Sequence, residues 1–177
     1  MGRMLLLGAA AAVAAVLAAG PAAGQGDGVG AGLLLGNVLG ASGKMWTSPS
    51  LAAIAGLGWS LAGDRSLVAQ ADYVVQGDGP LRRLDFFRQA AGSGRFLFYY
   101  GGGVRVQAFG ESRLGLRAPA GLGYLWGRIP VDAFAEVVPV LDLAPRARPR
   151  LDAAVGVRYF PPEPPHRRPA SAQEAGT

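Results

Sequence analysis

The sequence predicts an all-β fold, namely an eight-stranded antiparallel up-and-down transmembrane β-barrel. Three observations lead to this prediction. Apolar side chains alternate with small, polar or charged ones along most of residues 29–160, which is the period of a β-strand. The alternating segments are mostly about 9–14 residues long, which suits a tilted crossing of a bilayer. Charged residues share one phase of the alternation and apolar residues share the other, so one face of the sheet is apolar and the other is charged and hydrated.

The clearest alternation occupies residues 113–126. Every even-numbered position in this run is apolar, whereas the odd-numbered positions are arginine, glycine or proline until Leu125. Such a run is long for a strand, whose usual length is about 5–6 residues. We therefore expect one continuous strand here, with lipid on one side and a charged, hydrated lumen on the other.

The N-terminus has the features of a secretory signal peptide. Arg3 precedes an uncharged apolar run over residues 4–20, and small residues follow at positions 21–24. We predict cleavage after Gly24, so that residues 1–24 are a signal peptide; a retained membrane anchor is the alternative. No later segment is a continuous apolar run long enough to span a membrane as a helix, so an exported membrane protein with this sequence has to be a barrel.

The composition is unusual for a soluble domain. Half of the 177 residues are hydrophobic, only 16% are charged, and 28 are glycine. The chain has no cysteine, which excludes disulfides, thiol catalysis and thiolate metal sites. Lys44 is its only lysine, and the arginines lie either near the C-terminus or among strand-like segments with acids close by. We therefore predict no nucleic-acid-binding surface.

Eight strands are expected along the chain, joined mostly by short turns. Their predicted ranges are residues 29–35, 38–46, 51–61, 67–75, 96–108, 113–126, 131–143 and 151–160. Turns are predicted at Gly36-Asn37, residues 47–50, Gly63-Asp64, Gly110-Glu111 and residues 127–130. An even number of strands in up-and-down order can close on itself and leave no free edge.

Two connections and the C-terminal segment do not fit the strand pattern. Residues 76–94 are either a short amphipathic helix or a continuation of the neighbouring strands, and the sequence leaves both open. Residues 144–149 contain two prolines and two arginines, so we expect a loop. Residues 161–177 are proline-rich and polar, which predicts a disordered tail after a barrel of residues 25–160.

Charged residues in the second half of the chain identify the face that points inward. Four arginines and four acids share one phase of the predicted strands: Arg105, Arg113, Arg117, Asp132, Glu136, Asp142, Asp152 and Arg158. An eight-stranded barrel is just wide enough to be filled by side chains, and an unpaired buried charge is costly. We therefore expect these residues to form a structural network of Arg–Asp/Glu pairs in the lumen.

The opposite phase is predicted to be the exterior, because it carries leucine, valine, alanine and aromatic residues without charge. Aromatic girdles are expected where rings on this face lie near strand ends: Trp59, Tyr73, Phe96, Phe98, Tyr124, Trp126 and Tyr159. A soluble barrel of the lipocalin kind has the opposite sense, with a greasy interior and a polar outside. The sense of the alternation therefore favours a membrane barrel.

Four runs of the sequence carry a resemblance to known proteins: residues 113–125, 131–143, 99–103 and 156–160. They resemble a family of small bacterial outer-membrane β-barrel proteins of uncharacterised function, similar in fold to the OmpA- and OmpX-like barrels. The resemblance covers about residues 28–160 and is most specific over residues 96–160. It implies an eight-stranded outer-membrane barrel with charged residues inside, and it brings no catalytic residues. Barrels of this kind usually end on an aromatic residue, as Phe160 would, but this chain continues to Thr177.

No catalytic, cofactor-binding or metal-binding residue is predicted. The only histidine, His166, lies in the predicted tail, so the lipid A acyltransferase and outer-membrane protease chemistries of small barrels would have no base. The lumen acids share their space with arginines, which favours ion pairing over a metal or acid–base cluster. The run Gly101 to Gly103 is followed by neither a helix nor a Lys-Ser/Thr pair that would suggest phosphate binding. We predict that the protein is not an enzyme and needs no cofactor.

The expected function is a structural or surface-interaction role in the outer membrane of a Gram-negative-type bacterium. The expected partners are outer-membrane lipid and lipopolysaccharide, with the barrel-insertion machinery during biogenesis; a possible extracellular ligand stays unidentified. The alternative is a narrow passive pore for ions or very small solutes, because glycine is frequent on the inward phase.

Overall fold

A computed structural model describes residues 28–61, 66–109 and 112–161. The predicted signal peptide, residues 1–24, lies outside the described residues, as does the predicted tail apart from Pro161. The predicted turns at Gly63-Asp64 and Gly110-Glu111 also lie outside them. Within the described part of the chain, no helix is both long and apolar enough to cross a membrane.

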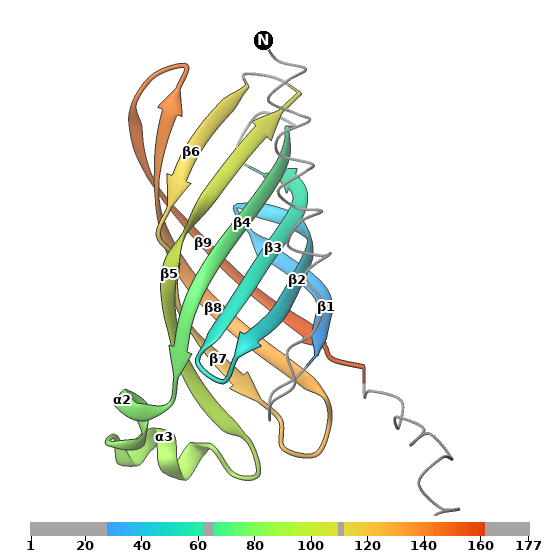
Figure 1. Ribbon diagram of the computed structural model, residues 1–177, viewed down its shortest axis with the longest axis vertical. Helices are drawn as coiled ribbons and strands as arrows, with labels where there is room; N and C mark the ends of the chain where they lie inside the picture. Colours follow the sequence, from blue (N-terminus) through green and yellow to red (C-terminus); the bar gives the residue numbers. More distant parts are fainter. Residues whose placement is uncertain (1–27, 62–65, 110–111, 162–177) are drawn as a thin grey trace, which may run out of the picture.

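The described strands close into an antiparallel barrel, which confirms the predicted all-β, eight-stranded up-and-down fold (Figure 1). The strands are β1 (Val29–Gly36), β2 (Val38–Ser48), β3 (Leu51–Ser60), β4 (Leu67–Gly77), β5 (Arg95–Ala108), β6 (Arg113–Arg117), β7 (Ala120–Leu125), β8 (Val131–Ala144) and β9 (Arg148–Tyr159). Strands β6 and β7 together occupy one strand position of the barrel wall, because both pair with β5 on one side and β8 on the other. Each of the eight strand positions is called a stave below. Strand β9 pairs with β1 and closes the barrel.

The predicted continuous strand over residues 113–126 is wrong in one respect, because it is interrupted between β6 and β7. Pro119 lies in the gap, and proline has no N–H to donate to a ladder. The neighbouring strands still bond across the gap. The Gly101 amide donates to the Pro119 carbonyl at 2.9 Å, and the Ala118 amide donates to the Pro139 carbonyl, also at 2.9 Å. Residues 113–125 therefore stay hydrogen-bonded to both neighbouring strands across the gap, although the regular strand is interrupted.

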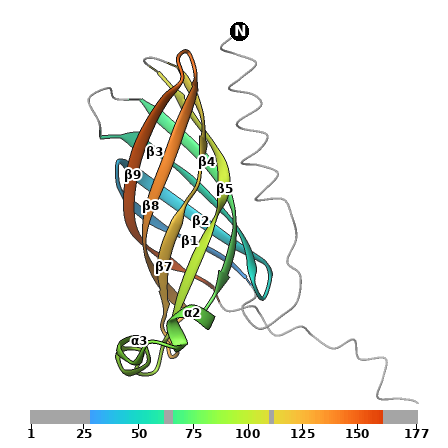
Figure 2. The same cartoon turned by 90° about the vertical axis from the view of Figure 1, so that its left-hand side faces the viewer.

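The connection between β4 and β5 is helical, which decides between the two alternatives that the sequence left open. It contains α2 (Gly79–Arg82), with a proline in its first turn, and α3 (Asp85–Ala90). Both helices lie at the end of the barrel where β1 begins and β9 ends, as the two views in Figures 1 and 2 show. At the opposite end, the predicted loop at residues 144–149 is shorter than expected, because β8 ends at Ala144 and β9 begins at Arg148.

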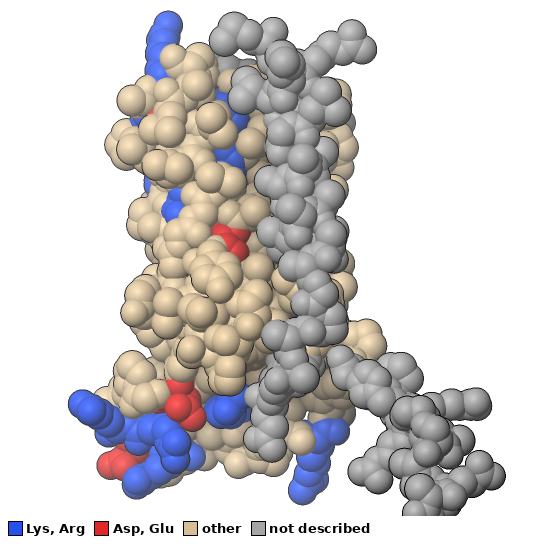
Figure 3. Space-filling model, viewed as in Figure 1, with Lys and Arg blue, Asp and Glu red and all other residues tan. Residues whose placement is uncertain are grey.

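Large apolar side chains are exposed on the outward face of every stave. They include Leu33, Leu39, Leu57, Trp59, Tyr73, Tyr100, Val104, Leu116, Leu122, Val137, Leu141, Leu151, Val155 and Tyr159. The face seen in Figure 3 is accordingly mostly uncharged along the barrel wall, and charged side chains gather at the end that carries the helices. Among the predicted girdle residues, Trp59, Tyr73, Trp126 and Tyr159 are exposed, whereas Phe96, Phe98 and Tyr124 are half-buried.

The inward face is apolar on one side of the lumen and charged on the other. A buried cluster comes mainly from β1 to β4: Leu34, Val38, Ala52, Ile54, Val68, Val74, Tyr99 and Phe134. Most of the buried charged side chains come from β5 to β9, with Lys44 and Asp72 reaching in from β2 and β4. The expectation of a lumen filled by ion pairs therefore describes only part of the interior, because apolar side chains and uncharged polar ones such as Gln70 and Gln107 fill the remainder.

Candidate functional site

The candidate site is a network of ion pairs inside the barrel, built in three layers along its axis. The register of β8 against β9 places Asp132 opposite Arg158 at the helix-bearing end, and Asp142 opposite Arg148 at the other end. Inward side chains recur only at every second residue of a strand, so one strand supplies few of them at any one level of the barrel axis. Each layer is therefore formed by residues from several strands.

The first layer lies nearest the helix-bearing end and is centred on Asp132. Its Oδ2 atom lies 3.4 Å from Lys44 Nζ on β2 and 3.5 Å from Arg158 Nη1 on β9. Arg158 Nε also donates to Ser42 Oγ at 2.9 Å, and its guanidinium stacks 3.8 Å above the centre of the Phe134 ring. One carboxylate therefore holds two cations, and an aromatic face supports the second of them.

The middle layer is centred on Arg117 of β6, whose guanidinium bridges two carboxylates. Arg117 Nε lies 2.9 Å from Asp72 Oδ1 on β4, and Arg117 Nη2 lies 3.2 Å from Glu136 Oε1 on β8. The Tyr99 hydroxyl donates to Glu136 Oε2 at 2.8 Å. A planar guanidinium suits this arrangement, because its donors are fixed in a fork that can serve two acceptors.

The third layer lies toward the opposite end. Arg105 of β5 pairs with Asp152 of β9. Arg150 reaches both acids of this layer, with Nη2 at 3.7 Å from Asp142 Oδ1 and Nε at 3.5 Å from Asp152 Oδ1. Taken over the three layers, these ion pairs join the cations Lys44, Arg105, Arg117, Arg150 and Arg158 to the acids Asp72, Asp132, Glu136, Asp142 and Asp152, so charges are matched in number.

The structure places almost all of the predicted lumen residues inside the barrel. The buried ones are Arg105, Arg117, Asp132, Glu136, Asp142, Asp152 and Arg158. Arg113 is only half-buried, because it stands at the first position of β6, close to the barrel end. Within the network, Arg117 pairs with Glu136, whereas Asp132 pairs with Lys44 and Arg158.

Sequence reasoning missed four members of the network. Lys44 and Asp72 lie on the inward phase of β2 and β4, and Tyr99 lies on the inward phase of β5, so strand parity alone could have found them. Arg150 lay between the predicted loop at residues 144–149 and the predicted strand at residues 151–160, but β9 begins at Arg148, which gives Arg150 the same phase as Asp152 and Arg158. The shared parity of Arg150 and Asp152 was visible in the sequence, but Pro145 and Pro149 indicated a loop rather than a strand.

Inward-facing glycines provide room for large side chains of the neighbouring strands. A Cβ atom at Gly156 would lie 2.4 Å from the Phe134 ring, and one at Gly121 would lie 2.6 Å from the Tyr99 ring. A Cβ at Gly56 would lie 2.8 Å from the Gln70 amide. These distances are shorter than real Cβ contacts, so glycine is required where a bulky neighbour crosses the lumen.

The arrangement acts as a structural brace. Each carboxylate of the three layers faces a cation. Three of the pairs connect strands that are not neighbours in the sheet: Lys44–Asp132, Arg105–Asp152 and Arg117–Asp72. Within the described residues, no group of three or more histidine, cysteine, aspartate or glutamate side chains could hold a metal ion. His166, the only histidine, lies outside them.

Replacing Arg117 tests the brace. The Arg117→Met variant keeps most of the side-chain length but leaves Asp72 and Glu136 buried without their shared cation. Because breaking a buried pair from one side is costly, we expect the free energy of unfolding to fall by about 3–5 kcal/mol. The measurement is urea unfolding of the detergent-folded protein.

Two variants serve as controls for that measurement. Arg148→Met makes the same chemical change at an exposed position, and its unfolding should match the wild type. The combined variant Arg117→Met, Asp72→Asn and Glu136→Gln removes all three charges while keeping an acceptor for Tyr99. It should be more stable than Arg117→Met alone, and equal loss in the single and combined variants would contradict the brace.

Comparison with known proteins gives no assignment. No family model matches the chain, nor does any curated protein or solved structure. The resemblance to small outer-membrane barrels therefore stays a prediction, and the fold and the lumen network are the features from which function is argued.

Proposed function

We propose that this protein is an integral outer-membrane β-barrel of a Gram-negative-type bacterium, exported by a cleaved signal peptide and serving a structural role. Its lumen is closed by side chains, and it carries out no catalysis. This proposal is supported by the orientation of the side chains, because apolar groups face the outside of the barrel and the charged network faces the lumen.

The observation that carries the proposal is the distribution of exposure along the strands. On β8, Val137 is 49% exposed while its neighbour Val138 is 1% exposed, and Asp132 is 1% exposed on the inward phase. The same alternation recurs around the barrel, so large aliphatic and aromatic groups face outward from all staves. Soluble proteins rarely expose a contiguous apolar surface of this extent, whereas a bilayer requires one.

Two connections at the end opposite the helices favour a structural role over adhesion. A single residue, Asn37, separates β1 from β2, and residues 145–147 separate β8 from β9. Such short connections offer little area for a protein ligand. Arg146 and Arg148 are exposed at this end.

The narrow-pore alternative is less well supported. The inward glycines Gly156 and Gly121 face the rings of Phe134 and Tyr99 rather than open space. A cavity between Gln70, Arg117 and Glu136 holds only about 10 Å³, about the space of one water molecule. Both observations favour a plugged lumen.

Electrophoresis in detergent tests the membrane-barrel proposal. We expect unheated protein to migrate differently from boiled protein, because a closed barrel resists unfolding by the detergent. The protein should also need detergent or lipid to stay in solution. Identical migration before and after boiling, together with solubility in plain buffer, would overturn the proposal.

Recordings from planar bilayers distinguish the plugged barrel from the pore. We expect purified folded protein to add no steady openings to the baseline of bilayers treated with detergent alone. Steady unitary currents that depend on protein concentration would favour the pore instead.

A further inference from the structure

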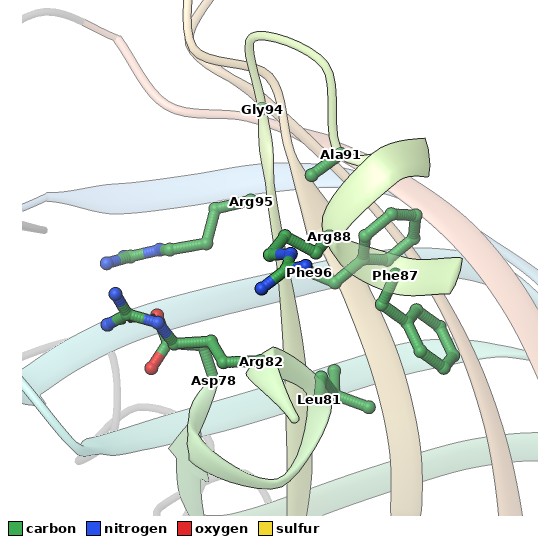
Figure 4. Close-up of a pocket in the computed structure, with 9 residues that line it drawn as sticks. All are labelled: Asp78, Leu81, Arg82, Phe87, Arg88, Ala91, Gly94, Arg95 and Phe96. Carbon is green, nitrogen blue, oxygen red and sulfur yellow. Dashed lines mark ion pairs between the residues drawn. The ribbon is translucent and has the colours of Figure 1, made fainter. Parts of the chain in front are cut away.

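The geometry points to a binding site for the headgroup of an anionic phospholipid at the helix-bearing end of the barrel. The site is a cavity of about 670 Å³ between α2, α3 and the start of β5 (Figure 4). It rests on the proposed function, because only a barrel in a membrane has lipid beside it. The cavity has a cationic wall and an apolar wall, which is the chemistry of an amphiphile with a phosphate at one end.

Three arginines form the cationic wall: Arg82, Arg88 and Arg95. Figure 4 shows the side chains of Arg82 and Arg95 extending toward the same side, with the guanidinium of Arg88 between the two helices and β5. Guanidinium groups that converge on one space suit a phosphate, whose oxygens accept paired N–H donors.

The neighbouring acids only partly balance these arginines. Arg88 Nη2 lies 2.7 Å from Asp85 Oδ1, and Arg82 Nη1 lies 3.8 Å from Asp78 Oδ2, while the side chains of both arginines remain more than 70% exposed. Arg95 forms no ion pair with an acid within the described part of the chain. A bound anion would face at least one cation with no competing carboxylate.

The surroundings of the cavity are also positively charged. The connections at this end, residues 78–94 and 126–130, add Arg83 and Arg128 but contain no acid beyond the two aspartates already named. Arginine side chains accordingly gather at the helix-bearing end in Figure 3. Clustered cations at the edge of a bilayer attract anionic lipid in preference to zwitterionic lipid.

The apolar wall connects the cavity to the outside of the barrel. The ring of Phe87 on α3 packs edge-on against Phe96 of β5, with centres 5.2 Å apart. Phe96 in turn contacts Tyr124 at 4.8 Å, and Tyr124 contacts Trp126 at 4.8 Å. Since Phe96, Tyr124 and Trp126 lie on the outward phase, this line of rings offers acyl chains a path from the cavity to the lipid-facing surface.

The position of α3 agrees with a helix lying in the headgroup layer. Phe86 is 74% exposed and Leu84 is 52% exposed, although both are apolar, and Arg83 and Arg88 lie close to them in the chain. The Tyr124 hydroxyl donates to the Ala91 carbonyl at 2.8 Å and ties the end of α3 to the barrel wall. Aromatic and cationic side chains together are typical of helices at a membrane interface.

Binding of short-chain lipids to the full chain, folded in a nonionic detergent, tests the site. Native mass spectrometry would compare dihexanoyl phosphatidylglycerol, dihexanoyl phosphatidylcholine and glycerol 3-phosphate. We expect the phosphatidylglycerol to bind at least about tenfold more tightly than either of the others, because it alone combines a net negative charge with acyl chains. Equal binding of both lipids would overturn the site, and equal binding of glycerol 3-phosphate would assign it to soluble phosphate compounds instead.

Matched arginine variants localise the binding. Arg88→Gln with Arg95→Gln should weaken phosphatidylglycerol binding roughly 10- to 30-fold, since each arginine near the surface contributes about 1 kcal/mol. Arg146→Gln with Arg148→Gln removes two exposed arginines at the opposite end and should leave it unchanged. Equal losses in the two double variants would overturn the assignment to the cavity.

Electrophoretic migration before and after boiling shows whether each protein is folded. If the double variant at the cavity fails to fold, Arg95→Gln alone carries the test, with an expected loss of roughly fivefold. A wild type that forms a heat-modifiable barrel but shows no lipid preference overturns only the lipid site. A wild type without the migration shift overturns the proposed function itself.

Discussion

Burying charge inside a barrel of only eight strands is the constraint on which the structure depends. The lumen of such a barrel is just wide enough for side chains, so a charge placed there has little water and needs a partner. The ion pairs meet that need across the lumen. Lys44 of β2 pairs with Asp132 of β8, and Arg117 of β6 pairs with Asp72 of β4, so strands that are not neighbours in the sheet are tied together.

This cross-lumen pairing also specifies the register of the strands. Sliding a strand by one residue would turn its charges toward the outside of the barrel and its leucines toward the lumen. The glycines add a second requirement, since the rings of Phe134 and Tyr99 fit only where Gly156 and Gly121 lie opposite them. Charge matching and size matching therefore favour the same closed barrel, which is the consistency expected of a sequence that specifies one fold.

Much of the fold could be predicted from the sequence because a strand has a period of two residues. That period places Asp132 and Glu136 inside and Leu141 and Val155 outside without any knowledge of the neighbours. The partners of each charge could not be predicted, because they depend on the stagger between distant strands. Asp132 thus pairs with Lys44, which is remote in sequence. The break at Pro119 and the helices of residues 79–90 depend on local backbone chemistry that alternation does not report.

The two ends of the barrel differ in a way that follows from the same topology. With eight strands, both ends of the described chain and the helical connection share one end, and the connections of β1 to β2 and of β8 to β9 lie at the other. The helix-bearing end combines exposed Phe86 with several arginines, which suits the boundary between lipid tails and headgroups. The barrel wall between the ends carries the apolar surface. The ion-pair network in the lumen, the apolar outer wall and the arginine-rich helix-bearing end are therefore separate parts of the molecule.

The central claim is that the apolar phase faces lipid, and spin labels at single cysteines test it most directly. The described chain has no cysteine of its own, so Leu57→Cys, Val137→Cys and, as the water-exposed control, Arg146→Cys each carry one label. In liposomes, labels at positions 57 and 137 should be relaxed strongly by oxygen and weakly by a water-soluble nickel chelate, whereas the label at position 146 should be relaxed mainly by the chelate. Outward labels that the nickel chelate relaxes more strongly than oxygen does would contradict a lipid-facing barrel.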